Sequence, residues 1–169
     1  MSQTSEKTLI LNSDQVDQKI RRIAYEIFEN NFKEKVLVLA GLDGQGYAFA
    51  KLLAGELETI SPITLKVVKV TLDKLAPQQS EVTLDVDAKE LKKKCIILID
   101  DVLNTGRTLA YGMKPFLTSE VKKIEVAVLV NRSNTLFPIT PTYTGYQLTT
   151  ILNDHVEVVL GKKSAVYLL

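Results

Sequence analysis

The sequence predicts an α/β fold, in which a central parallel sheet is flanked by helices and carries a small appended lobe. Short apolar runs alternate with segments of helical periodicity between residues 12 and 132, and parallel strands need crossover connections of this kind. After residue 132 the helical periodicity ends, and β-rich stretches follow at 156–160 and 165–168. We therefore predict a single domain, with a core over about residues 12–132 and a lobe from about residues 1–11 and 133–169.

The first half of the predicted core repeats a pattern of strand, loop and helix. A helix of about four turns follows the capping residues 12–14, because apolar residues then recur at helical spacing. An apolar strand at 36–40, a glycine-containing loop at 41–46 and a periodic helix at 47–57 come next. Residues 63–70 are β-rich, which indicates another strand.

The second half of the core contains the most informative strand. Residues 71–88 are polar and are interrupted by PQQS at 77–80, which is typical of a mobile excursion with strand-like ends. The apolar run at 95–99 has the length of a central strand that is buried on both faces. A polar turn at 100–108 leads into a helix, and residues 124–130 form a further strand. The inner stripe of that helix is predicted to be Leu109, Met113, Phe116 and Leu117.

The composition excludes several classes of protein. The 169 residues carry a formal net charge of +1, so no global field draws the protein to nucleic acid or to an anionic membrane. The single cysteine, Cys95, cannot form an internal disulfide, which favours a reducing compartment. Neither a spanning apolar run nor the pattern of a secretory signal is present. We expect a cytoplasmic protein with no membrane partner.

Two acidic residues, Asp100 and Asp101, directly follow the central strand. In parallel α/β sheets, ligands bind beyond the carboxyl ends of the strands, which is where these carboxylates are expected. Adjacent carboxylates repel each other and lose hydration when they are buried, so hydroxyl groups and a cation would stabilise them. The following turn, residues 104–108, offers backbone N–H groups at a helix N-terminus, and such groups favour a phosphate. Thr105 and Thr108 add hydroxyl donors.

Three alternative interpretations fit these segments less well. Asp100 and Asp101 would merely cap a turn if they stood alone, but the Thr-Gly-Arg-Thr continuation at 105–108 disfavours that role. A nucleotide hydrolase needs a lysine directly after its glycine loop, and here Tyr47 follows the last glycine. The dinucleotide-binding Gly-x-Gly-x-x-Gly pattern is missing from residues 41–46 as well.

The thirteen residues 96–108, IILIDDVLNTGRT, resemble the phosphoribosyl pyrophosphate signature of the type I phosphoribosyltransferases. The similarity extends over most of the chain, and it is closest to the pyrimidine-operon attenuator proteins that double as uracil phosphoribosyltransferases. Residues 21–27 are similar to the first helix of that family, and residues 41–46 occupy the position of its pyrophosphate loop. A similarity to the hood lobe of the family is found at residues 129–132, 137–139 and 143–145.

The resemblance implies a type I phosphoribosyltransferase fold and the transfer of ribose 5-phosphate from phosphoribosyl pyrophosphate (PRPP) to a nucleobase, with release of pyrophosphate. Asp100 and Asp101 would hold the ribose hydroxyls and, directly or through water, a magnesium ion. The implied 5′-phosphate site is Asn104, Thr105, Gly106, Arg107 and Thr108. The implied pyrophosphate site is the backbone amides of Asp43, Gly44, Gln45 and Gly46. The implied base site is Tyr143, stacked on the base, with Thr144 and Asn131. A structural role for Tyr143, packed inside the lobe, stays open.

Departures from the family bear on the substrate and on the rate. Purine enzymes of this fold usually carry an acidic residue at the position of Asn104 and a lysine at that of Asn131, so the resemblance implies a pyrimidine such as uracil. The pyrophosphate loop of the attenuator family ends Lys-Thr-Arg-Gly, whereas residues 43–46 read DGQG and contain no cation. The flexible loop at 72–77, LDKLAP, lacks the family's Tyr-Arg-Asp-Asp. Since cations bind phosphate strongly, we expect a slow or divergent transferase.

A second function stays open, in which the protein senses PRPP or a nucleotide and binds RNA without catalysis. Phosphate contacts would then come from Lys19, Arg21, Arg22 and Arg132. A helix with basic residues is more often a solvated face, so the enzyme is favoured over the RNA-binding regulator. We expect a homodimer or a higher homo-oligomer. His155, beside Asp154, has no metal-ligand spacing, and a packing or surface role is expected for it.

Overall fold

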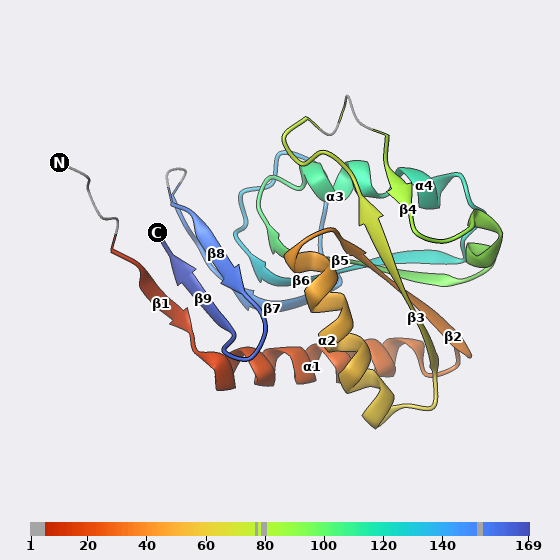
Figure 1. Ribbon diagram of the computed structural model, residues 1–169, viewed down its shortest axis with the longest axis horizontal. Coiled ribbons are helices and arrows are strands. Elements are labelled where there is room, and N and C mark those ends of the chain that lie inside the picture. Colours follow the sequence, from red (N-terminus) through yellow and green to blue (C-terminus); the bar gives the residue numbers. More distant parts are fainter. Residues whose placement is uncertain (1–5, 77, 79–80, 152–153) are drawn as a thin grey trace.

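The computed structural model describes residues 6–76, 78, 81–151 and 154–169. A six-stranded sheet in the order β4-β3-β2-β5-β6-β7 forms the core, and a three-stranded sheet in the order β1-β9-β8 lies to one side of it (Figure 1). The core strands are β2 (Val36–Leu42), β3 (Thr64–Thr71), β4 (Thr83–Leu84), β5 (Cys95–Leu103), β6 (Lys123–Asn131) and β7 (Tyr143–Gln147). Neighbouring core strands are parallel except for β4, which runs antiparallel to β3. The sheet that the sequence predicted as parallel is therefore mixed at one edge.

Helices cover both faces of the core sheet because its central strand buries side chains on both sides. Along β5, Ile97 and Ile99 join the apolar cluster beneath helices α1 (Ser13–Asn31) and α2 (Gln45–Ile60), whereas Ile96 and Leu98 join the cluster on the opposite face. The opposite face is covered by the 3-10 helix η2 (Ala88–Leu91), α3 (Arg107–Gly112) and α4 (Lys114–Leu117). This two-sided burial confirms the predicted α/β architecture.

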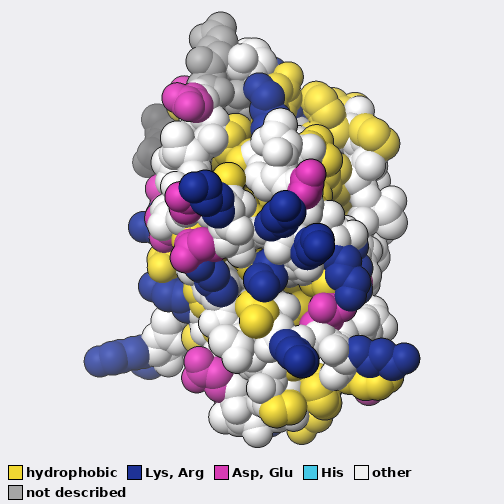
Figure 2. All heavy atoms as spheres, turned by 90° about the vertical axis from the view of Figure 1, so that its right-hand side faces the viewer, with side chains coloured by type: hydrophobic (Ala, Val, Ile, Leu, Met, Phe, Trp, Pro, Cys, Tyr) yellow, Lys and Arg dark blue, Asp and Glu magenta, His cyan; other side chains and the backbone are white. Residues whose placement is uncertain are grey.

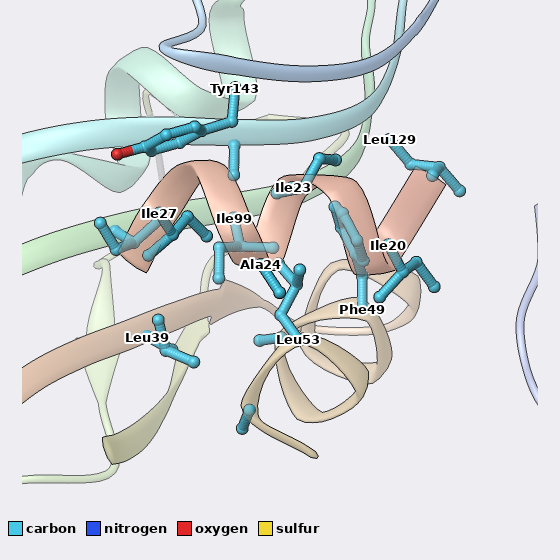
Figure 3. Packing of buried hydrophobic residues seen from close by; sticks show 14 of the residues in the cluster. Ile20, Ile23, Ala24, Ile27, Leu39, Phe49, Leu53, Ile99, Leu129 and Tyr143 are labelled. Atoms are coloured by element: carbon cyan, nitrogen blue, oxygen red, sulfur yellow. The ribbon is translucent and has the colours of Figure 1, made fainter. Parts of the chain in front are cut away.

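Helix α1 begins at the predicted cap and packs through one apolar stripe. The Asn12 side chain accepts a hydrogen bond from the Gln15 amide, and the Gln15 side chain accepts one from the Asn12 amide, both at 2.9 Å. Ile20, Ile23 and Ile27 point from α1 into the buried cluster between the helix and the sheet (Figure 3). No helix within the described ranges is long and apolar enough to cross a membrane.

The central strand is longer than the sequence predicted. β5 continues through Asp100 and Asp101 to Leu103, because β6 keeps pairing with it up to the position where Leu103 lies opposite Asn131. The polar turn therefore begins at Asn104 and not at Asp100. As a consequence, the two acidic residues are held by the regular geometry of a strand.

The predicted boundary between core and lobe lies too early in the chain. Strand β7 follows residue 132, yet it pairs with β6 as the last strand of the core sheet. Gly145 permits this close packing, since a β-carbon there would lie 2.6 Å from the Leu129 carbonyl oxygen. The separate small sheet consists of β1 (Thr8–Leu11), β8 (Val156–Val159) and β9 (Ala165–Leu168).

Two further segments differ from their predictions. The helix after the polar turn is divided into α3 and α4, with a proline in the first turn of α4, and Leu117 of its predicted inner stripe is 69% exposed. Leu109 and Phe116 of that stripe are buried. The predicted mobile excursion at 71–88 contains strand β4, and η2 begins at its last residue. Pro77, Gln79 and Ser80 of this segment lie outside the described residues.

One end of the molecule is rich in basic side chains. Figure 2 shows the side at the right of Figure 1, where lysine and arginine side chains outnumber acidic ones. Strands β2, β5 and β6 begin at this end, and Lys35, Lys94 and Lys123 precede or begin them. The carboxyl ends of the same strands lie at the opposite edge, away from this basic face.

Candidate active site

Asp100 and Asp101 lie near the carboxyl end of β5, which runs between β2 and β6. Only 5% of the surface of Asp100 is exposed, and Asp101 is half-buried. Burial and the negative charge of Asp101 raise the pKa of Asp100 well above its ordinary value. Lys74 Nζ lies 3.9 Å from Asp100 Oδ1 and counteracts this rise. A desolvated carboxylate with one partly exposed cation beside it is a group that a ligand hydroxyl or a metal ion would stabilise.

The glycine loop after β2 is built directly against Asp100. Gly44 has a φ of 92°, a left-handed value that favours glycine, and α2 starts at the next residue. A β-carbon on Gly46 would lie 2.8 Å from Asp100 Oδ1 and 3.0 Å from the Ile99 carbonyl oxygen. The loop and the acid are therefore parts of one site, because only a glycine allows the first turn of α2 to come this close.

The backbone amides of the glycine loop are not equally available to a ligand. The Asp43 amide donates to the Val70 carbonyl oxygen, and the Gly44 amide donates to the Asp43 carboxylate, both at 2.9 Å. The amides of Gln45 and Gly46, in the first turn of α2, have no acceptor within the described part of the chain. An anion at this loop would thus meet two open N–H groups at a helix N-terminus, and not the four that the sequence predicted.

The loop at residues 104–108 encloses a small pocket of about 40 Å³ that is lined by Asp100 and residues 102–109. Gly106 has a φ of 86°, and a β-carbon there would lie 3.2 Å from the Ile139 side chain. The Thr105 carbonyl oxygen accepts hydrogen bonds from the amides of Leu136 and Phe137, which fixes the loop against the segment after β6. The loop leads directly into the N-terminus of α3, and the open N–H groups of such a turn favour a compact anion.

The guanidinium of Arg107 is hydrogen-bonded to another segment of the chain and not directed to an anion in the pocket. Its guanidinium donates a hydrogen bond to the Gln78 side chain at 2.7 Å. Its backbone amide lies 3.3 Å from the Thr105 hydroxyl oxygen. Arg107 therefore joins the loop to the segment at 71–88 through its side chain.

A larger cavity of about 440 Å³ lies next to the small pocket. Its lining is Asn104, Thr105, Arg132, Asn134, Leu136, Asp154 and His155. Asn104 and Thr105 line both spaces, so a ligand in one would extend into the other past these two residues. The sequence indicated no ligand role for Asn134, Asp154 or His155. No local motif marks these three residues, because only the return of the chain toward β8 brings 154 and 155 to this loop.

Arg132 is a buried structural cation beside this cavity. It is 4% exposed, and its guanidinium donates to the Thr150 hydroxyl at 2.9 Å and to the Asp154 carbonyl oxygen at 2.6 Å. Arg132 also donates a hydrogen bond to the Asn104 side-chain oxygen at 3.2 Å. Arg132 therefore ties the 104–108 loop to the lobe and is not free to contact RNA, as one alternative required.

The prediction that Tyr143 stacks on the base is wrong. The Tyr143 ring is 1% exposed and lies in the apolar cluster near Ile27 of α1 (Figure 3). Its hydroxyl donates to Glu125 at 3.0 Å and lies within hydrogen-bond distance of Asn30 and Asn31. The structural role that the sequence left open is the observed one, because β7 joins the core sheet and turns this side chain under α1.

The other two residues of the predicted base site lie in different surroundings. Asn131 ends β6 beside Leu103, and its side-chain oxygen accepts a hydrogen bond from the Ser133 amide at 3.0 Å. The Thr144 carbonyl oxygen accepts one from the Arg22 guanidinium at 2.7 Å. Asn131 is therefore at the ligand-binding edge of the sheet, whereas the Thr144 backbone is already used by α1.

The structure is that of an α/β protein in which two acidic residues and two glycine-containing loops lie together at the carboxyl edge of the sheet. Both loops end at helix N-termini, which suits a ligand with two anionic ends joined by a hydroxylated middle. A model of the phosphoribosyl transferase domain matches residues 8–162. The chain belongs to this phosphoribosyltransferase family.

Named relatives agree with this assignment. The chain is 30% identical to the "Bifunctional protein PyrR" of Macrococcus caseolyticus, over 96% of this chain and 99% of the relative. It is 32% identical to the protein of the same name from Bacillus subtilis, over 94% of this chain and 92% of the relative. Among solved structures, the hypoxanthine phosphoribosyltransferase of Trypanosoma cruzi superposes with a TM-score of 0.75 at 15% identity, covering 88% of this chain and 84% of that one. The last comparison shows a common fold.

Proposed function

We propose that this phosphoribosyltransferase transfers ribose 5-phosphate from PRPP to a pyrimidine base such as uracil and releases pyrophosphate. One observation carries the proposal: the buried carboxylate of Asp100 lies directly against Gly46 and lines the pocket of the 104–108 loop. A single ligand can therefore touch both loops and the acid at once. PRPP has a 5′-phosphate at one end of a ribose diol and a pyrophosphate at the other, which matches this arrangement.

Each part of PRPP has a counterpart in the site. The loop at 104–108 would hold the 5′-phosphate through its amides and the hydroxyls of Thr105 and Thr108. Asp100 and Asp101 would accept hydrogen bonds from the ribose hydroxyls. The open amides of Gln45 and Gly46 would bind the pyrophosphate, and the adjoining cavity of about 440 Å³ would take the base.

The donor set fits a magnesium ion. Mg²⁺ prefers oxygen ligands and usually combines one or two carboxylates with water and substrate phosphates. Among the described residues no three His, Cys, Asp or Glu side chains gather into a metal site, so Asp100 and Asp101 would need the phosphates of PRPP to complete the shell. When bound, the ion would neutralise charge on the pyrophosphate.

The protein's contribution to the reaction is positioning and electrostatic stabilisation. As pyrophosphate leaves, negative charge grows on it and positive charge grows at the anomeric carbon. Asp100 and Asp101 would hold the ribose hydroxyls, and Lys74 Nζ lies 3.9 Å from Asp100 Oδ1. Because residues 43–46 contain no cation, Lys74 would take over part of the stabilisation of the leaving group.

A direct assay tests this function. Purified protein is mixed with magnesium, PRPP and each of the common nucleobases in turn, and nucleotide and pyrophosphate are measured. We expect product with uracil and little or none with hypoxanthine or guanine. Calorimetry should show that PRPP binds, and that Asp100→Asn/Asp101→Asn binds it more weakly by several-fold or more while remaining folded. The absence of nucleotide from every base, with no PRPP binding, would rule the proposal out.

A second candidate function is RNA binding, and the basic face in Figure 2 is the observation that favours it. Three of the four residues first considered for it are engaged within the protein: Arg21 pairs with Glu56, Arg22 donates to the 144–145 backbone, and Arg132 is buried. The fourth, Lys19, lies over the Tyr146 ring at 5.9 Å. Contacts would instead come from lysines such as Lys35 and Lys94 at the opposite end from the active site. Affinity for a pyrimidine-leader RNA that falls steeply with salt would support this function, and a salt-independent shift would exclude it.

Assembly and location are proposed on the same basis. We expect a homodimer or a higher homo-oligomer, which sedimentation of the purified protein would show. A cytoplasmic role in pyrimidine salvage follows from a substrate such as PRPP. Fractionation of the cells that make the protein would test it.

A further inference from the structure

Two lysines share one aromatic ring next to the glycine loop. Lys51 Nζ and Lys69 Nζ each lie 4.8 Å from the centroid of the Tyr47 ring. Tyr47 directly follows Gly46, whose amide is one of the two open N–H groups of the loop. In the described ranges of the chain, neither ammonium group forms an ion pair. The loop that contains no cation of its own is therefore followed by a ring that carries two.

Tyr47 and Lys51 come from the first turns of α2. They are four residues apart, so their side chains lie on the same face of the helix. Side chains on a helix lean toward its N-terminus, which here is the glycine loop. Lys51 therefore extends back over the Tyr47 ring, toward the end of the helix at which an anion would bind.

Lys69 reaches the same ring from β3. Both of its neighbours in the strand belong to the apolar cluster on the opposite face, so Lys69 points toward α2. It pairs in register with Gly41 of β2, where a β-carbon would lie 2.6 Å from Tyr47 Cα. This close approach of helix and sheet places the Lys69 side chain beside the ring. The Asp85 carboxylate accepts a hydrogen bond from the backbone amide of Lys69 at 2.8 Å and does not pair with its ammonium group.

The arrangement gathers positive charge where the binding of an anion needs it. The Tyr47 ring attracts each ammonium group through its π-electrons, but the two like charges repel each other. Asp43, at the start of the loop segment 43–46, adds a negative charge that opposes an anion. A ligand with several negative charges at the loop would relieve the repulsion between the lysines and would be attracted in spite of Asp43.

We propose that Lys69 and Lys51, held on the Tyr47 ring, bind the pyrophosphate group of PRPP and supply the positive charge that the glycine loop lacks. This inference rests on the transfer reaction proposed above. Lys69, which comes from the sheet, contacts the pyrophosphate, and Lys51 adds its charge. Tyr47 is a positioning residue that acts through both lysines.

The lysines would act on the leaving group of the reaction. The base nitrogen forms a bond to C1′ and passes its proton to water, while the C1′–oxygen bond breaks and its electron pair leaves with pyrophosphate. Negative charge on pyrophosphate increases as this bond breaks, so a cation beside it stabilises the transition state more than it stabilises bound PRPP. Loss of Lys69 should therefore lower kcat as well as the affinity for PRPP, and it should leave KM for the base unchanged.

Fragments of PRPP test the proposed contact. Calorimetry with magnesium pyrophosphate probes the two lysines, and ribose 5-phosphate, which has no pyrophosphate, probes the rest of the site. We expect Lys69→Met to weaken pyrophosphate binding about fivefold to tenfold and Lys51→Met about twofold to threefold, with ribose 5-phosphate unaffected. Lys66→Met is the control, because Lys66 lies on the opposite face of β3 and pairs with Glu90 at 2.7 Å. It should change neither affinity.

Two further changes separate charge from structure. Tyr47→Leu removes the ring and should weaken pyrophosphate binding about threefold, whereas Tyr47→Phe keeps the ring and should bind as the wild type does. Asp43→Lys, added to Lys69→Met, returns a cation to the loop itself and should restore pyrophosphate binding. A purely structural role of Lys69 would not respond to a charge placed at residue 43.

The outcomes separate this inference from the proposed function. The role of the lysines is overturned if Lys69→Met, shown to be folded by urea unfolding, binds pyrophosphate as tightly as the wild type. It is also overturned if Lys69→Met loses ribose 5-phosphate to the same extent as pyrophosphate. Either result, with PRPP binding to the wild type, leaves the transferase intact. Failure of the wild type to bind PRPP and ribose 5-phosphate would refute the transferase as well.

Discussion

Gly46 and Asp100 are in such close contact that a β-carbon on Gly46 would lie 2.8 Å from the Asp100 carboxylate. The contact joins the N-terminus of α2 to the end of β5, and it places the open amides of the glycine loop beside the buried acid of the strand. Two segments that are more than fifty residues apart in the chain thereby become one binding site.

Gly46→Ala should disrupt this contact. The new methyl group would press on the Asp100 carboxylate and on the Ile99 backbone, and neither can move freely. We expect a loss of about 1–3 kcal/mol in the free energy of unfolding and a drop in PRPP affinity of about tenfold or more. Gly55→Ala on the same helix is the control, because nothing lies within 4 Å of its β-carbon. The control should be neutral or stabilising by up to about 1 kcal/mol in urea unfolding.

Asp100 should make the stability of the free protein depend on pH. Its pKa is raised in the folded protein, so the folded state holds this proton more tightly than the unfolded chain does. In metal-free and ligand-free protein, the contribution to stability is complete below the ordinary carboxyl pKa and is lost as pH rises through the raised value. Asp100→Asn should therefore be more stable than wild type at neutral pH, and the difference should shrink toward about pH 4. Urea unfolding over a pH series would contradict this if the difference were constant.

Lys74 should contribute to PRPP binding through its charge. Its Nζ lies 3.9 Å from Asp100 Oδ1, and its side chain is partly exposed, so the effect is screened by solvent. We expect Lys74→Met to weaken PRPP binding by roughly threefold to tenfold in calorimetry and to reduce its salt dependence. Lys74→Arg should restore most of the affinity. Lys89→Met, an exposed lysine on η2, should change neither quantity.

Tyr143 should matter for stability and not for substrate use. Tyr143→Phe leaves the ring in the core but removes the hydroxyl that bonds to Glu125 and lies near Asn31. We expect a loss of about 1–2 kcal/mol in the free energy of unfolding, with kcat/KM for uracil unchanged. Tyr25→Phe, at an exposed position on α1, should stay within about 0.5 kcal/mol of wild type. Because Tyr143→Phe keeps the ring, a selective rise in KM for the base would show instead that the hydroxyl contacts the base.

Arg132→Lys should reduce the stability of the protein. Lysine cannot reproduce the planar set of bonds to Thr150, Asp154 and Asn104, so several buried acceptors lose their donor. We expect a loss of about 2–4 kcal/mol in urea unfolding. An unchanged free energy of unfolding would contradict the structural role of the Arg132 network.

The sequence determined the parts of this protein that depend on local order. The apolar run before Asp100, the Asn12 cap and the two glycine loops are local patterns, and the structure has a strand, a helix start and two turns at these places. The 96–108 segment was long enough to indicate the family, which the match over residues 8–162 confirms. The assignment of individual site residues remains a prediction that the proposed experiments address.

Only the tertiary structure decided which distant groups meet. It placed Tyr143 under α1, because β7 extends the core sheet, and it brought Asp154 and His155 to the loop of Asn104. It also showed that Arg132 fixes the Asn104 carboxamide. Local patterns follow from backbone geometry and the periodicity of burial, which neighbouring residues specify. Contacts between segments depend on which strand pairs with which, and that is set by the packing of the whole chain.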